Sequence, residues 1–211
     1  MTLTKRFLRA KHWQLFLLTF GIPMIFQFIM MGTMFASIGS GAPPDPTTFF
    51  SFFSVFPVLM IIFVGTFFGW FWSIAIGLQN KIPANIKMKT GLFKIFFFIP
   101  ITYMLLFSIG IATAMTGLSG MSSRGEEPNI GLVLGSMAII IPLHLFSMFC
   151  IFYCLYFVSK TFKTVELQRE TTFSDFAGEF FLIWFYPIGI WIIQPKINKM
   201  VDETPQVIVD R

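Results

Sequence analysis

Long stretches without charged residues alternate along the chain with short polar segments. No Asp, Glu, Lys or Arg lies within 13–36, 47–80, 95–123 or 128–159. A run of about 20 apolar residues matches the roughly 30 Å hydrocarbon core of a bilayer. The pattern therefore predicts four transmembrane helices, at about 13–36, 50–78, 92–118 and 131–158. The segments between them all contain Pro, Gly or Asn, the residues that turns favour: 37–46, 79–91 and 119–130.

The basic residues are distributed unevenly among the segments that flank these helices. Of the Lys and Arg residues, 4 precede the first helix, 3 lie between the second and third, and 6 follow the fourth. The other two connecting segments carry 0 and 1. Because cytoplasmic loops are enriched in Lys and Arg, both termini are expected in the cytoplasm. We therefore expect a four-helix transmembrane bundle over 1–158 and a cytoplasmic tail over 159–211.

A further apolar segment, Phe180–Gln194, lies within this tail. Thr172 followed by Asp175 fits the capping box that opens a helix, and this helix is expected to run into the apolar segment. About 15 helical residues extend only about 22 Å, which is short for a crossing. Because Pro187 interrupts the segment, we favour a Pro-kinked interfacial or re-entrant helix. A segment covered by a protein partner and a true fifth span are the alternatives.

Two parts of the chain resemble a known group of membrane proteins. The run KTVELQRETTFSDFAGEFFLIWFYPIGIWIIQPKIN (163–198) resembles the tail of small, uncharacterised four-span integral membrane proteins of Bacteroidetes. The run KHWQLFLLTFGIPMIF (11–26) is similar to the first span of such proteins. The resemblance covers about a quarter of the chain. It implies a location in the bacterial inner membrane, and it carries over no activity and no catalytic residue.

The composition agrees with a membrane protein and lacks the residues that most enzymes need. Charged residues make up 12% of the chain, whereas a soluble domain carries about 25%. The expected spans contain no Asp or Glu, and His12 and His144 are the only histidines. Paired carboxylates, a spaced set of metal ligands and a nucleophile motif are therefore missing. We expect a non-enzymatic protein without cofactor, metal or nucleic acid, in which the net charge of +5 reflects membrane orientation.

Small residues recur at every fourth position of the second predicted helix. They lie in the run GTFFGWFWSIAIG (65–77), and they are Gly65, Gly69, Ser73 and Gly77. This spacing places all four on one helical face, where another backbone can approach closely. We favour packing inside the chain's own bundle, and contact between subunits is the alternative.

Two polar side chains are expected near the middle of spans, Gln27 in the first and His144 in the fourth. An ionisable residue within the membrane is a functional candidate, and histidine changes charge near neutral pH. The structural alternative is a neutral His144 imidazole hydrogen-bonded to Gln27, Thr102, Tyr103 or Ser108. The Gln27 amide is expected to join helices through hydrogen bonds.

Two functions of different classes fit these features. The first is a structural or accessory subunit of a larger membrane complex, in contact with the lipid bilayer and with a protein partner or further copies of itself. The second is a small oligomeric transporter or channel, with His144 and Gln27 lining the path. Because no acidic residue lies within the spans to bind a cation, we favour the first.

Overall fold

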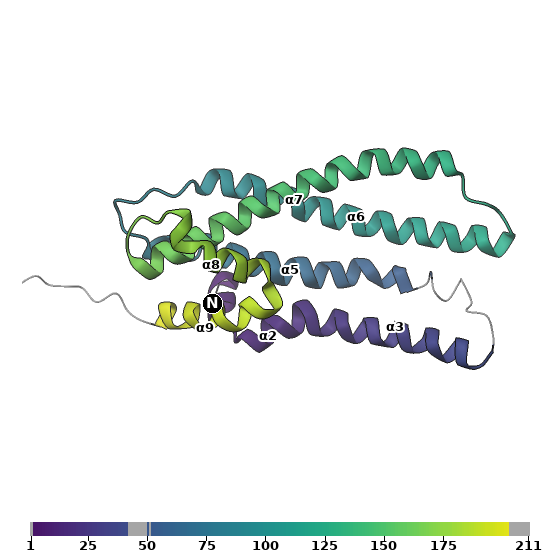
Figure 1. Cartoon of the computed structure of the whole chain (residues 1–211), viewed down its shortest axis with the longest axis horizontal. Coiled ribbons are helices and arrows are strands. Elements are labelled where there is room, and N and C mark those ends of the chain that lie inside the picture. Colours follow the sequence, from purple (N-terminus) through teal and green to yellow (C-terminus); the bar gives the residue numbers. More distant parts are fainter. Residues whose placement is uncertain (1, 42–49, 51, 203–211) are drawn as a thin grey trace, which may run out of the picture. The chain divides into compact units, whose positions relative to one another are not determined.

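The computed structural model describes residues 2–41, 50 and 52–202, and the regular elements in these ranges are all helical (Figure 1). Four helical stretches are long and apolar enough to cross a membrane: His12–Gly39, Phe53–Lys81, Thr90–Arg124 and Ile130–Leu167. They coincide with the four predicted spans, so the all-helical, multi-pass membrane class is confirmed. The expected loop at 37–46 and the end of the tail lie partly outside the described residues.

The first stretch is preceded by a short helix and contains a change in helical geometry. Helix α1 (Leu3–Arg9) comes first, followed by α2 (His12–Phe16), the π-helical turn η1 (Leu17–Gly21) and α3 (Ile22–Gly39). Pro23 lies in the first turn of α3. It has no backbone N–H to donate to the carbonyl four residues earlier. The wider π-helical turn coincides with this missing hydrogen bond.

The other three stretches are nearly continuous helices. The second consists of η2 (Phe53–Val55), α5 (Phe56–Ala75) and η3 (Gln79–Lys81). The third is α6 (Thr90–Arg124), which is followed by Gly125, a residue with φ +68°. The fourth, α7 (Ile130–Leu167), passes through the boundary that the sequence placed at residue 158. The expected boundary between the bundle and the tail therefore lies inside α7 and not at its end.

Helix α8 (Phe173–Trp184) begins at the predicted capping box. The Asp175 carboxylate accepts hydrogen bonds from the backbone N–H of Thr172, at 2.8 Å, and from its hydroxyl, at 2.9 Å. Arg169 adds an ion pair, with 2.6 Å between Nη2 and Oδ1 of Asp175. The Arg169 guanidinium and the Thr172 donors hold the pKa of this carboxyl well below its ordinary value. The predicted helix start is confirmed.

The break in the apolar segment lies slightly before the predicted position. Helix α8 ends at Trp184, and α9 (Tyr186–Asp202) begins after Phe185, which has a non-helical ψ of 56°. Pro187 therefore lies in the first turn of α9. Backbone N–H groups in the first turn have no acceptor within the helix, so a proline there costs no helical hydrogen bond. Gly189 packs directly on the Leu182 carbonyl. The two helices form a hairpin, and α9 also packs against α1 and α2.

The chain divides into two compact units. The first comprises Met1–Phe16, Phe67–Phe93 and Tyr153–Arg211, and the second comprises Leu17–Thr66 and Lys94–Phe152. The first unit holds most of the buried apolar side chains of the described residues, the largest being those of Trp70, Phe68, Phe71, Phe93, Phe162 and Phe176. In the second unit most apolar side chains are exposed, as hydrocarbon-facing residues of a membrane protein are expected to be.

Candidate functional site

His144 lies in the second unit, and its imidazole contacts a tyrosine of α6. The distance between His144 Nδ1 and the Tyr103 hydroxyl is 3.1 Å. The Tyr103 ring also stacks on Phe107, with 5.7 Å between ring centroids and an interplanar angle of 20°. Of the four partners that the sequence allowed, the structure places Tyr103 against His144. The imidazole therefore has one nitrogen in an internal hydrogen bond.

The second ring nitrogen of His144 has no such partner. His144 is exposed, and Nε2 makes no hydrogen bond within the part of the chain that the structure describes. From 131 to 146 every residue of α7 is exposed except Ile140, so this half of the helix is only sparsely covered by the described chain. The Ser136 hydroxyl in the same stretch donates to its own helix, at 2.7 Å from the Val133 carbonyl. The imidazole is thus left with an unused polar atom on an otherwise apolar, exposed surface.

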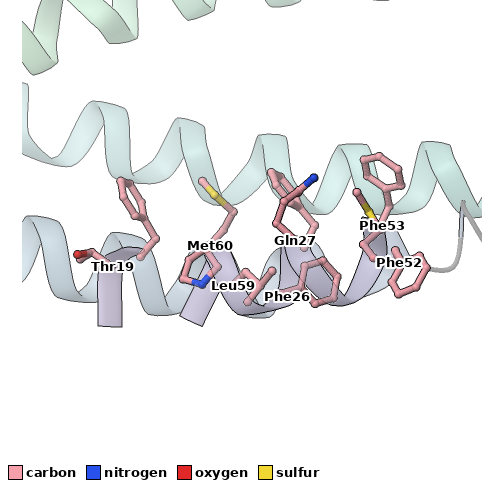
Figure 2. Close-up of a pocket in the computed structure, with 11 residues that line it drawn as sticks. Thr19, Phe26, Gln27, Phe52, Phe53, Leu59 and Met60 are labelled. Carbon is pink, nitrogen blue, oxygen red and sulfur yellow. The ribbon is translucent and has the colours of Figure 1, made fainter. Parts of the chain in front are cut away.

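Gln27 borders an apolar cavity of about 440 Å³ between α3 and the start of the second stretch. Figure 2 shows Thr19 at one end, the rings of Phe52 and Phe53 at the other, and Gln27 between them. The lining residues are apolar apart from Thr19 and Gln27; they are Pro23, Phe26, Met30, Phe52, Phe53, Phe56, Leu59, Met60 and Phe63. The Gln27 side chain is exposed, and no described residue hydrogen-bonds to it. The helix-joining hydrogen bond expected of Gln27 is therefore not formed within the described chain.

The small-residue face of α5 is largely covered by α1. A Cβ placed on Gly69 would lie 2.7 Å from the ring of Phe7, and one on Gly77 would lie 2.5 Å from Thr4 Cγ2. Ser73 is buried between them, and its hydroxyl donates to the Gly69 carbonyl at 2.7 Å. The close approach that the spacing predicts is made by the N-terminal helix, which precedes the four spans.

Gly65, the first residue of this face, is different from the other three. No described atom outside its own helix backbone and its chain neighbours lies within 4 Å of the position that its Cβ would take. Packing within the chain therefore explains the small side chains at Gly69, Ser73 and Gly77. It does not explain the small residue at Gly65, where the space is open.

A buried glutamine fixes α1 against the hairpin of α8 and α9. Gln194 Oε1 accepts a hydrogen bond from Trp70 Nε1 at 2.7 Å. Its Nε2 donates to the carbonyls of Phe7, Leu8 and Ala10, at 3.1, 3.3 and 2.8 Å. These carbonyls lie at the end of α1, where no further helical turn follows, and the Asn198 amide also donates to those of Leu8 and Ala10. Both the amide and the helix end are therefore paired, although Gln194 is fully buried.

Four charged side chains join α7, α8 and α9. Lys163 Nζ lies 2.7 Å from Glu166 Oε2 and 2.8 Å from Glu179 Oε1. Lys196 Nζ lies 3.2 Å from Glu166 Oε1, and the cluster is electrically balanced. The Lys163 and Glu179 side chains are only 18% and 11% exposed. The cluster links α7, α8 and α9 where these three helices meet.

Sequence reasoning identified neither Gln194 nor the charged cluster as important. Gln194 was only the end of an apolar segment, and its partner Trp70 lies 124 positions earlier. The available signal was an amide within an otherwise apolar helix, because such a group requires partners when it is buried. For the cluster, the spacing of Lys163 and Glu166 by three residues was a visible signal of a helical ion pair.

An apolar face of the α8–α9 hairpin remains uncovered. The exposed large apolar side chains on these two helices and at the junction between them are those of Phe173, Phe181, Trp184, Phe185, Ile188, Trp191 and Ile192. Trp191 lies beside the start of the first span, with its ring centroid 4.4 Å from that of His12 and 5.7 Å from that of Phe16. Helix α8 contacts α7 through Phe176, whose ring centroid lies 5.3 Å from that of Tyr156. The hairpin thus packs beside His12 and Phe16 in the first long stretch and beside Tyr156 in the fourth.

The described residues contain no group of three His, Cys, Asp or Glu side chains placed to hold a metal ion. Cys150 and Cys154 are free and buried in α7. Comparison with protein-family models, with curated proteins and with solved structures finds no match to this chain. The remaining candidates for a functional role are His144, Gln27 and the exposed apolar surfaces.

Proposed function

We propose that the chain is a structural or accessory subunit of a larger membrane complex in the bacterial inner membrane. The observation that carries this proposal is the exposed His144 side chain, near the middle of a candidate span, whose Nε2 atom has no hydrogen-bond partner among the described residues. In hydrocarbon an unpaired polar group has an unfavourable free energy of several kcal/mol, because no water is present to bind it. A polar group on a neighbouring subunit, or on another copy of this chain, would satisfy the imidazole.

The exposure of α7 supports the same proposal. Between 131 and 146 every residue except Ile140 is exposed, so much of the mainly apolar surface of this helix is available to a neighbouring helix. Lipid would cover apolar side chains equally well, but lipid tails offer no hydrogen-bonding group to His144. The imidazole therefore favours a protein neighbour at this helix.

We further propose that both termini are cytoplasmic and that the α8–α9 hairpin lies in the membrane interface. Tryptophan is enriched at this level of the bilayer, and the exposed face carries Trp184 and Trp191. The contacts of Trp191 with His12 and Phe16 support a position beside the entry of the first span. In this arrangement the unpartnered apolar face is covered by headgroups and the first part of the acyl chains.

The subunit proposal is tested by purification of the full chain in mild detergent. We expect the wild-type chain to elute with stoichiometric partners or as an oligomer. His144→Leu removes the exposed nitrogen and should weaken the association about five-fold, which corresponds to about 1 kcal/mol for a hydrogen bond between helices. Light scattering with mass spectrometry of the eluted complex measures both the mass and the composition.

Two matched variants separate association from internal structure. Tyr103→Phe removes the internal partner of His144 and leaves Nε2 in place. Ser136→Ala alters the same exposed helix at a hydroxyl that is already bonded to its own backbone. Neither variant should weaken the association. A wild-type chain recovered as a lone monomer, or equal losses in all three variants, would contradict the proposal.

Transport through an oligomer is a second function that the exposed imidazole would serve. His144 would then line a path between subunits, and its protonation would control passage. Flux of ions or protons in reconstituted vesicles distinguishes the two functions. Flux that is lost in His144→Ala would favour transport, whereas an absence of flux in the wild-type oligomer would favour the subunit function.

A further inference from the structure

The cavity beside Gln27 combines an apolar wall with one unpaired amide. Its volume of about 440 Å³ lies within the range of roughly 300 to 1,000 Å³ that is typical of small-molecule sites. The rings of Phe26, Phe52 and Phe53 belong to the wall, and Phe26 and Phe52 contact each other edge to face at 5.9 Å. The wall therefore fits an aromatic or branched apolar body.

The amide determines which apolar molecules fit best. Gln27 has two N–H donors and one acceptor oxygen, and none is hydrogen-bonded by a residue that the structure describes. It lies between the two ends of the cavity (Figure 2). A saturated acyl chain would fill the space and leave the amide unpaired in hydrocarbon. A molecule with a carbonyl or hydroxyl group at that position would pair it.

We infer that this cavity binds a small lipid-soluble molecule that carries a carbonyl or hydroxyl group on an apolar, ring-containing body. The apolar body contacts the phenylalanine wall, and the polar group hydrogen-bonds to the Gln27 amide. A site with a fixed hydrogen-bonding group discriminates against an analogue that lacks the matching group. The molecule enters from the lipid, because the cavity lies within residues of the first two spans.

The inference is independent of the proposed subunit function. The cavity is lined by residues of the first two spans, whereas His144 lies on α7. His144→Leu should therefore leave ligand binding unchanged while it weakens association. A variant that loses association but keeps ligand binding, or the reverse, distinguishes the two proposals.

Benzophenone is a suitable probe because it has two rings, a ketone and photochemical reactivity toward nearby C–H bonds. After irradiation of the detergent-solubilised full chain, we expect adducts on lining residues, with Met30 and Met60 the clearest positions for mass spectrometry. Leu59→Trp fills the cavity and should abolish these adducts. Adducts that are absent from the lining residues, or that persist in Leu59→Trp, would overturn the inference.

Competition with a matched pair of unreactive molecules tests the role of the amide. Diphenylmethanol and diphenylmethane differ by one hydroxyl group, so the ratio of their competing concentrations measures recognition of that group. In the wild-type chain this ratio should favour diphenylmethanol about five-fold more than in Gln27→Leu, as expected for one hydrogen bond. Thr33→Val, a control on the same helix whose hydroxyl is bonded to the Met30 carbonyl, should keep the wild-type ratio.

The outcome of the competition is decisive in either direction. A ratio that is equal in the wild-type chain and in Gln27→Leu would mean that the cavity accepts hydrocarbon of any kind, such as a lipid acyl chain, and the inference would be wrong. A ratio that falls only in Gln27→Leu, with adducts on the same residues, supports a polar ligand group at the amide.

Discussion

Gln194 shows how one side chain can connect distant parts of the sequence. Its amide joins Trp70 of α5 to the carbonyls that end α1, and all of these groups are in the first compact unit. The sequence showed a polar residue within an apolar helix, which is a signal of burial with partners. It did not show which partners, because they lie 124 to 187 positions away.

Replacement of Gln194 by Leu tests this connection. The buried Trp70 N–H loses its acceptor, whereas the Leu8 and Ala10 carbonyls keep the Asn198 amide as a donor. We therefore expect the free energy of unfolding in detergent to fall by about 1 to 3 kcal/mol. Gln79→Leu is the control, because the Gln79 amide donates to the Ala75 carbonyl within its own helical turn. This substitution should lower the free energy of unfolding by less than about 1 kcal/mol. Denaturant unfolding followed by tryptophan fluorescence measures both. Equal losses would mean that Gln194 has no special role.

For Gln27 and His144, the sequence predicted the positions but only part of the surroundings. An amide and an imidazole in long apolar runs are visible without a structure. Tyr103 was among the partners expected for His144, and the structure confirms it. The open environment of Gln27 was not predictable, because it depends on which side of α3 faces the second span.

At the level of elements, the glycine spacing of α5 predicted a close helix contact but not the helix that makes it. The contacting element is α1, whose Phe7 ring lies against Gly69. A seven-residue helix before the first span gives no long periodic pattern, and its docking depends on Gln194 far along the chain. The signal of a close approach was therefore readable, and the identity of the partner was not.

Gly69→Leu should displace α1 from this face. The new side chain would overlap the Phe7 ring, and α1 carries basic residues that trypsin recognises once the helix is released. We expect tryptic cleavage within residues 5–11 to become about ten-fold faster. Gly65→Leu is the matched control, since its side chain would meet open space and should leave cleavage unchanged. Equal acceleration in the two variants would contradict docking of α1 on this face.

The start of α8 predicts a dependence of stability on pH. Arg169 and Thr172 lower the pKa of Asp175 below its ordinary value of 3.8, so the ionised carboxylate is favoured in the folded chain. The stabilisation is fully present above about pH 4, and it declines as the pH falls further toward the lowered pKa. The difference in melting temperature between the wild-type chain and Asp175→Asn should therefore be largest near neutral pH and shrink below about pH 4.

Asp202→Asn provides the comparison for this pH series. Its carboxylate is exposed, with Oδ1 3.9 Å from Arg9 Nε, and it takes no part in the start of α8. We expect little difference from the wild-type chain at any pH, because an exposed ion pair contributes little to stability. An Asp175→Asn difference that grows on acidification would show that the sign of the predicted effect is wrong.

For the whole molecule, the number and type of the long helices could be predicted, and the grouping into units could not. Hydropathy depends on local composition, so the four spans are visible as uninterrupted apolar runs. The two compact units cut across α5 and α7 and bring the first 16 residues together with the segment from Tyr153 onward. This grouping depends on contacts such as those of Gln194 and of the Lys163 cluster, which no local pattern reveals.

The proposed placement of both termini in the cytoplasm and of α8–α9 in the interface defines how the four spans are oriented in the membrane. A phosphatase that is active only outside the cytoplasm, fused after Arg211, tests it most directly, with a fusion at Gly125 as the comparison. The account predicts an inactive enzyme after Arg211 and an active one at Gly125. Activity after Arg211 would mean that the hairpin segment crosses the membrane, and the four-span topology would be contradicted.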